Sequence, residues 1–295
     1  MIKLILKGAV IGLANIIPGV SGGTMMVVMG IYDKLIHAIT HLKSEWKEAL
    51  KLLIPIVIGM GLGIVVLTEI ITTALETFPA QTNLMFIGLI MGGLPVIVKK
   101  LKETGKKVSV GNIVALIAFF ALVAGFAMIG EAEGSAAQVA LNLGSILKLF
   151  FVGIIASATM IIPGVSGSMV LMLLGYYYTI LDSVSAFIRG LLAFDMPALI
   201  QNFGILCPFG IGVLAGIGVI AKLVEMVFVK FPNYAYCSII GLILASPLDI
   251  IFMSDLSKYN VVSVLTGAVT FGIGFVIATK LGEALTIIVP CQVAP

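Results

Sequence analysis

Long stretches with few or no charged side chains alternate along this chain with short clusters of lysine and acidic residues. The apolar stretches cover 8–31, 52–75, 83–98, 108–130, 149–181, 203–229, 234–253 and 259–279. About 20 helical residues cross the hydrocarbon core of a bilayer. The stretches lack the strict alternation of membrane strands, so the pattern predicts membrane-spanning helices.

Composition supports the same class. Hydrophobic residues make up 60% and charged residues 11% of the chain, and the mean hydropathy is +1.22. These values exclude a soluble globular domain and predict an all-α integral membrane protein. We expect no cleavable signal peptide, because the run after Lys3 and Lys7 continues apolar past Pro18 without a small-residue cleavage site. The three cysteines lack paired spacing and are interpreted as packing residues.

One seven-residue motif occurs twice. Ile16–Gly22 reads IIPGVSG, and Ile161–Gly167 is identical at all seven positions, displaced by 145 residues. Proline removes a backbone donor and glycine permits positive φ, so neither copy fits an uninterrupted helix. A broken helix inside an apolar stretch is typical of the binding site of a secondary transporter.

The lysines predict how the first copy sits in the membrane. Lys3 and Lys7 precede the stretch 8–31, and four lysines follow it between 34 and 51. The positive-inside rule places both groups in the cytoplasm. We therefore expect 8–31 to be a re-entrant hairpin that turns at the motif, with one kinked span as the alternative. The 33-residue stretch 149–181 would be about 50 Å long as a helix, which also favours two limbs.

The two halves share more than the motif. Pro55 and Pro79 match Pro208 and Pro232 at an offset of 153 residues, and Gly88 matches Gly241 at the same offset. Each half thus has one hairpin and three spans, and an odd number of spans inserts the second half upside down. The sequence predicts two inverted-topology repeats, 1–130 and 146–295, as in many secondary transporters, with both termini cytoplasmic.

The motif tips have the chemistry of an anion site. Their backbone N–H groups are not used by a helix, their hydroxyls are close by, and helix N-termini follow. Tight helix packing by small residues is the alternative for one copy, but two identical tips favour a phosphate or carboxylate site. The candidate residues are Asn15, Pro18, Gly19, Ser21, Gly22, Gly23, Thr24, Pro163, Gly164, Ser166, Gly167 and Ser168.

Charged residues inside spans form a second candidate group, because each is costly in the membrane. Glu69 has no basic neighbour in sequence and is a hypothetical proton-coupling or gating residue. Lys222 and Glu225 are candidates for the same coupling or gating role and are spaced for an i, i+3 ion pair, with snorkelling near a span end as the alternative. His37 and His41 have the i, i+4 spacing of metal ligands, but no third ligand is in view. We interpret their segment, 32–51, as an interfacial amphipathic helix and predict no metal site.

The two PGVSG tips, with the flanks from Asn15 to Thr24, resemble a bacterial family associated with translocation of undecaprenyl phosphate, the C55 lipid carrier of peptidoglycan synthesis. The resemblance covers nearly the whole chain. It implies a flippase that returns the carrier from the outer to the inner leaflet of the cytoplasmic membrane for cell-wall synthesis, by alternating access. The implied partner is a polyprenyl phosphate lipid held by its phosphate at the tips, with no cofactor and no nucleic acid.

Two other functions remain alternatives. Polyprenyl pyrophosphate phosphatases carry a similar tip with an arginine, where this chain has Gly22 and Gly167, and neither tip has a nearby base. We therefore expect a protein that binds phosphate without cleaving it, not an enzyme. A secondary transporter of a small anion is the other alternative. No Walker loop is present, so proton coupling, ion coupling and gradient-driven exchange stay open, as do the oligomeric state and the direction of net transport.

Overall fold

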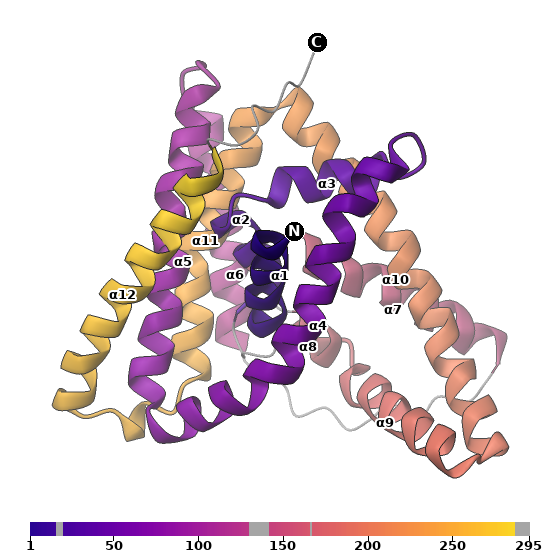
Figure 1. The fold of residues 1–295 in the computed structure, drawn as a ribbon. Helices are drawn as coiled ribbons and strands as arrows, with labels where there is room; N and C mark the ends of the chain where they lie inside the picture. The colour runs from indigo at the N-terminus through magenta and orange to yellow at the C-terminus, as the bar shows by residue number, and fades with distance from the viewer. Residues whose placement is uncertain (16–19, 130–141, 166, 287–295) are drawn as a thin grey trace.

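The computed structural model describes residues 1–15, 20–129, 142–165 and 167–286, and within them it contains helices and no strand (Figure 1). The helices are α1 (Ile2–Ala14), α2 (Gly22–Val28), α3 (Tyr32–Thr40), α4 (Trp46–Thr77), α5 (Pro79–Glu103), α6 (Val110–Ile129), α7 (Leu143–Ile161), α8 (Gly167–Leu173), α9 (Tyr177–Ala193), α10 (Met196–Lys230), α11 (Pro232–Met253), the 3-10 turn η1 (Leu256–Lys258) and α12 (Val261–Thr286). Within the described ranges, seven helices are long and apolar enough to cross a membrane: α4, α5, α6, α7, α10, α11 and α12. The predicted all-helical membrane protein is confirmed at this level.

Six of the seven long helices overlap the predicted spans, and the seventh, α7, overlaps the first part of the stretch 149–181. The segment 32–51 is not one helix, because α3 ends at Thr40 and α4 begins at Trp46. The Thr40 hydroxyl donates to the carbonyl oxygens of Ile36 and His37. Such local bonds compete with helix continuation, which accounts for the break.

Glycines of positive φ separate the short helices that follow each motif copy from the next helix. Gly30 has φ 64° between α2 and α3, and Gly175 has φ 75° between α8 and α9. A side chain is disfavoured in this left-handed region. The two glycines are 145 residues apart, so the chain turns in the same way after each copy.

Close helix pairs join each motif segment to the long helix that comes after it. A Cβ added to Gly8 or Gly59 would overlap a carbonyl oxygen of the facing helix in the α1–α4 pair. Gly153 and Gly212 stand at the matching places between α7 and α10, with the same consequence. Small residues let helix backbones approach in this way, and both pairs are therefore nearly in backbone contact.

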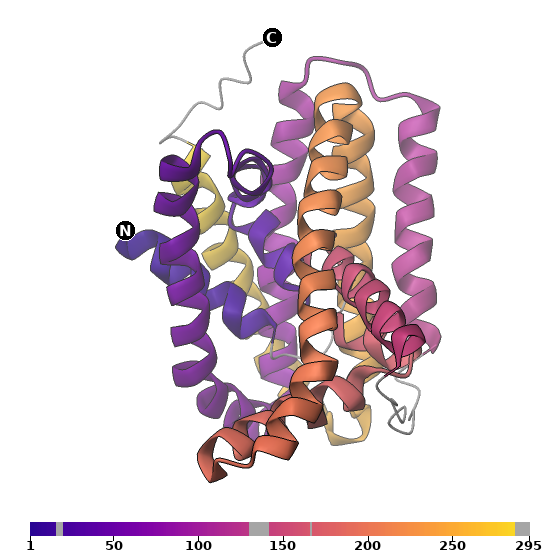
Figure 2. The ribbon, with the colours of Figure 1, turned by 90° about the vertical axis from the view of Figure 1, so that its right-hand side faces the viewer.

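The central helices α5 and α11 are the most buried of the seven long helices. Asn83, near the start of α5, donates to the Ser254 hydroxyl at the end of α11 over 2.8 Å. Thr104, at the end of α5, donates to Asn233 at the start of α11 over 2.7 Å. The two helices are therefore antiparallel. Each packs on a partner from the other half of the chain, α5 on α12 and α11 on α6 (Figures 1 and 2).

The two central helices also begin in the same way. Phe78 has φ −133° and ψ 58° before Pro79, and Phe231 has φ −134° and ψ 58° before Pro232. Proline cannot continue a preceding helix, so the chain bends at both places. The same break thus occurs at positions 153 residues apart.

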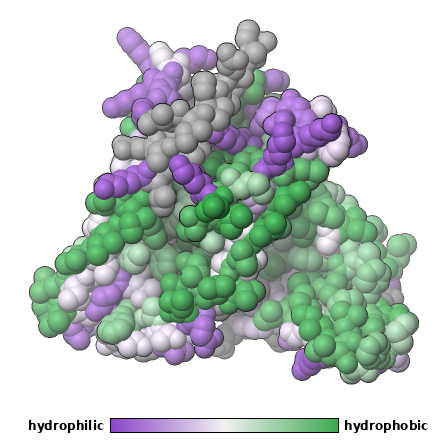
Figure 3. Space-filling model, in the orientation of Figure 1, coloured by the Kyte–Doolittle hydropathy of each residue, from purple (hydrophilic) through white to green (hydrophobic). Residues whose placement is uncertain are grey.

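Polar residues gather at one end of the molecule. In Figure 3 the largest hydrophilic patches lie at the upper end, over the connections between α3 and α4 and between α5 and α6. Apolar residues cover much of the surface below, with smaller hydrophilic patches along the lower edge. Lysines 43, 47, 99, 100, 102, 106 and 107 belong to these regions. Below this lysine-rich end, exposed apolar side chains are frequent on α4, α10 and α12, as expected for helices that face lipid.

Candidate functional site

The structure describes most of the motif residues. Pro18, Gly19 and Ser166 lie outside the described residues. In the first copy, Ser21 is the N-cap of α2 and its side chain makes no capping hydrogen bond. The residues that follow it, from Gly22 to Thr24, are buried in the first turn of α2. In the second copy, residues 163–165 are a buried loop, and Gly167 and Ser168 begin α8.

The two motif copies meet in the interior of the protein. The backbone N–H of Gly164 donates to the Thr24 hydroxyl oxygen over 2.7 Å, and the bond is buried. Thr24 itself is 0% exposed. A Cβ added to Gly23 would lie 3.3 Å from the carbonyl oxygens of Met160, Ile161 and Ile162, at the end of α7. Residues 140 positions apart therefore form one polar contact between the halves.

The second tip rests against the middle of α11. Gly164 has φ 80°, and a Cβ at this position would lie 2.9 Å from the Leu242 carbonyl oxygen. Both observations require glycine here. Leu242 lies ten residues after Pro232, about 15 Å along the 22-residue helix. The contact between the tips is therefore at about half the depth of the helical layer.

The glycine after each motif serine contacts a polar side chain. A Cβ added to Gly22 would overlap the Asn15 side-chain oxygen, and one added to Gly167 would lie 3.0 Å from the Thr159 hydroxyl oxygen. Asn15 was predicted as a site residue. Thr159, which is buried and hydrogen-bonded to a carbonyl of α7, was not, because sequence alone gives no reason to choose it within an apolar stretch.

The charged candidates are not gathered around the tips. Glu69 lies within the long apolar helix α4 and is exposed, as is Lys222 in α10. The carboxylate of Glu225 faces the imidazoles of His37 and His41, at 3.1 Å and 3.4 Å. The partner of Glu225 thus comes from α3 and not from the i, i+3 position on α10.

Asp249 in α11 is a buried acidic residue that the sequence-based search missed. It is 3% exposed, and its Oδ1 atom has no hydrogen-bond partner in the part of the chain that the structure describes. It lies seven residues after Leu242 and four after Ala245, on the face of α11 that packs on Val165 of the second tip. The signal was available: it is the only charged residue in the stretch 234–253.

Fold and site together define a multi-pass helical membrane protein with a buried polar contact between two broken helical segments. The chain belongs to the undecaprenyl phosphate translocase-like family, whose model matches residues 11–264.

Two named relatives support the assignment. The polyprenyl-phosphate transporter of Staphylococcus aureus is 30% identical over 285 residues, which is 95% of both chains. The polyprenyl-phosphate transporter of Vibrio cholerae is 29% identical over 196 residues, 62% of this chain and 60% of its own. No solved structure matches the chain. Both relatives are named as transporters, which agrees with the expectation that this chain is not an enzyme.

Proposed function

We propose that this protein is a flippase that carries undecaprenyl phosphate between the leaflets of the cytoplasmic membrane. The membership in the undecaprenyl phosphate translocase-like family and the names of the two relatives support the substrate. The observation that carries the mechanism is the buried hydrogen bond from Gly164 to Thr24, because it joins two polar tips at half depth, where a transporter must hold a charged headgroup.

The two motif segments act as re-entrant hairpins in this proposal. The buried Lys7 side chain donates to the carbonyl oxygen of Met29, so the two ends of the first segment lie side by side. A span that crossed the membrane would hold its ends about 30 Å apart. The glycine turns at Gly30 and Gly175 then lead both segments into α3 and α9 in the same way.

The phosphate binds where the tips now bind each other. Its oxygens accept hydrogen bonds from the Gly164 N–H and the Thr24 hydroxyl, whose present bond satisfies these buried groups while the site is closed. Two further side chains complete the first tip and lie close to this contact in sequence. Ser21 caps no N–H group of α2, and the Asn15 side chain lies beside Gly22. Polar backbone groups are tolerated at membrane depth only where a partner accepts or donates their hydrogen bonds. When the tips separate, the phosphate headgroup is that partner.

Alternating access follows from two inverted repeats. The antiparallel course of α5 and α11, which correspond at an offset of 153 residues, supports the inversion. The matching α1–α4 and α7–α10 pairs support two bodies, each carrying one tip. Rocking of these bodies opens the site first to one leaflet and then to the other, while the C55 tail stays in lipid along the apolar outer surfaces. The net direction is from outer to inner leaflet, which recycles the carrier for peptidoglycan synthesis.

Asp249 is the proposed coupling residue. The carboxyl group of Asp249 is buried on α11, one to two turns beyond the residues that pack on the second tip, whereas Glu69 is exposed. In the described ranges, α6 has no charged residue, and the basic residues of α5 lie at its far end. Those of α10 lie in the last third of that helix, which leads into the start of α11. With no basic residue of these three helices at its level, the carboxyl group takes up a proton from one side and releases it on the other.

Reconstitution in liposomes tests the function. Fluorescent polyprenyl phosphate is placed in both leaflets, and the fraction that a membrane-impermeant quencher reaches is followed with time. We expect protein-dependent exchange of the monophosphate. Release of inorganic phosphate from the pyrophosphate would instead indicate a phosphatase, and flux of soluble phosphate without lipid exchange would indicate an anion transporter. Either of these two results would overturn the proposal.

A further inference from the structure

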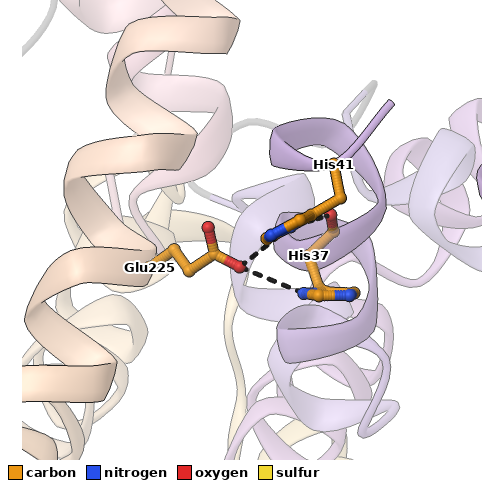
Figure 4. Close-up of side chains that lie close together, drawn as sticks. All are labelled: His37, His41 and Glu225. Atoms are coloured by element: carbon orange, nitrogen blue, oxygen red, sulfur yellow. Dashed lines mark hydrogen bonds and ion pairs between the residues drawn. The ribbon is translucent and has the colours of Figure 1, made fainter. Parts of the chain in front are cut away.

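A cluster of two histidines and one glutamate lies outside the motif contact. His37 and His41 are one helical turn apart on α3, and their rings stack with centroids 4.1 Å apart. Glu225 reaches them from α10 (Figure 4). The two histidines come from the first half of the chain and Glu225 from the second, so only the fold brings the three residues together.

The three side chains converge on one point. The Oε1 atom of Glu225 lies 3.1 Å from Nδ1 of His37 and 3.4 Å from Nδ1 of His41. One ligand atom from each of the three residues lies within 4.8 Å of the other two. Ligand atoms in a tetrahedral zinc site, with bonds of about 2.0–2.1 Å, are about 3.3–3.4 Å apart. We propose that His37, His41 and Glu225 bind a divalent transition metal ion of the zinc class.

A fourth residue orients one of the ligands. The Nε2 atom of His37, on the far side of the ring from Glu225, lies 3.4 Å from the carboxylate of Glu45. A metal-bound histidine commonly donates its second N–H to a carboxylate in this way, which fixes its tautomer and orientation. The Thr40 hydroxyl now lies 3.0 Å from Nδ1 of His41, a contact that coordination replaces. Imidazole and carboxylate suit zinc, cobalt or nickel, and water fills the open position.

The ion would fasten the two halves to each other. Helix α3 follows the first motif copy and is already tied to α5 by the Asp33–Lys100 ion pair. Helix α10 packs on α7, which leads into the second copy. A metal ion between α3 and α10 therefore opposes relative movement of the two tips. This consequence rests on the proposed function, whereas the metal site itself does not.

Metal binding to the purified chain tests the site directly. The chain has only two histidines, so a tag without histidine is required, and the three cysteines are replaced by alanine in every variant. Titration calorimetry with Zn²⁺ and visible absorption with Co²⁺ should show one ion per chain. His37→Ala, His41→Ala and Glu225→Gln should each weaken binding at least tenfold, and Glu45→Gln should weaken it less.

Glu48→Gln is the matched control, because Glu48 is exposed nearby on α4 and pairs with Lys51. It should bind the ion as the parent does. Size-exclusion profiles and thermal midpoints without metal verify that each variant is folded. Parent protein that binds no better than a variant with both His37→Ala and His41→Ala would overturn the site. So would unchanged affinity in Glu225→Gln, which would mean that an exposed histidine pair alone attracts the ion.

Transport supplies a separate readout. Zn²⁺ should slow leaflet exchange by the parent, a chelator should restore it, and Glu225→Gln should be insensitive to both. Sensitivity that persists in Glu225→Gln would overturn the proposed link between this site and movement. Absence of exchange in metal-free parent protein would contradict the proposed function, while the binding titration would still decide whether the metal site exists.

Discussion

Thr24 is the residue at which the two motif copies become one site. Its hydroxyl oxygen accepts the Gly164 N–H at a position with no solvent exposure. A buried N–H without a partner costs about 1–3 kcal/mol, so this bond stabilises the closed arrangement of the tips. In the proposed mechanism the same two groups separate to hold the phosphate, so Thr24 should matter for both stability and binding.

Replacing the hydroxyl tests both roles. Thr24→Val keeps the shape of the side chain and removes the acceptor, so it should lower the stability of the protein by about 1–3 kcal/mol and reduce leaflet exchange at least tenfold. Thr24→Ser restores the hydroxyl and should recover most of the exchange. Thermal unfolding and the liposome assay measure the two effects. Equal exchange in Thr24→Val and the parent would remove Thr24 from the site.

Asp249 makes a different prediction. Asp249→Asn keeps the size of the side chain but cannot carry a proton, so exchange should fall to the rate seen without a pH gradient. The fold should persist, because burial of a carboxyl group whose Oδ1 atom lacks a hydrogen-bond partner among the described residues destabilises the native state. The comparison is Glu69→Gln, which should leave the response to the gradient intact. A gradient response lost in Glu69→Gln and kept in Asp249→Asn would assign the coupling to Glu69.

At the level of helices, glycines determine how closely the elements pack. Gly63 faces a carbonyl oxygen of α1, whereas a Cβ added to Gly61, two residues earlier on the same helix, meets nothing within 4 Å. Gly63→Ala should therefore push α1 and α4 apart and destabilise the protein by about 1–3 kcal/mol, with a loss of exchange. Gly61→Ala should be neutral or slightly stabilising. Equal thermal midpoints for the two variants would contradict the close α1–α4 contact.

Much of this architecture was predictable because its signals are local. Apolar length indicated the long helices. The repeated pairs Pro79–Pro232 and Gly30–Gly175 mark places where helices break, whereas Pro55 and Pro208, which also repeat, lie inside α4 and α10. The offset of 153 residues that links Pro79 to Pro232 also links the matching breaks before α5 and α11. Helix boundaries near the surface were less predictable, since the end of α3 depends on hydrogen bonds of one threonine.

Contacts between distant segments could not be predicted from the sequence. Nothing in the chain order indicates that α5 packs on α12 and α6 on α11, or that the partner of Glu225 lies 188 residues away at His37. The motif copies were expected to face each other, but the contact of Thr24 with Gly164 depends on which side chain reaches across. The site residues were chosen by chemical type, and only the fold reveals which of them touch.

At the scale of the whole molecule, the positions of the lysines and the order of the helices together predict the membrane topology. The lysine-rich connections lie at one end of the helical layer, and α5 and α11 traverse it in opposite directions. If both motif segments are re-entrant, the chain before and after each of them lies on one side of the membrane. If either segment crosses the membrane, the chain before that segment and the chain after it lie on opposite sides.

Cysteine labelling in cells decides between these topologies. The variants are made in a cysteine-free background. Lys3→Cys and Lys43→Cys lie on either side of the first motif segment, whereas Leu143→Cys precedes the second segment and Ser257→Cys follows α11. All four positions are exposed. An impermeant maleimide should label the second pair in intact cells and the first pair only after permeabilisation, because lysine-rich regions stay in the cytoplasm. Labelling of Lys3→Cys and Lys43→Cys from opposite sides would make the first segment a kinked span. The two tips could then no longer approach the midplane from opposite faces, and alternating access by inverted repeats would have to be abandoned.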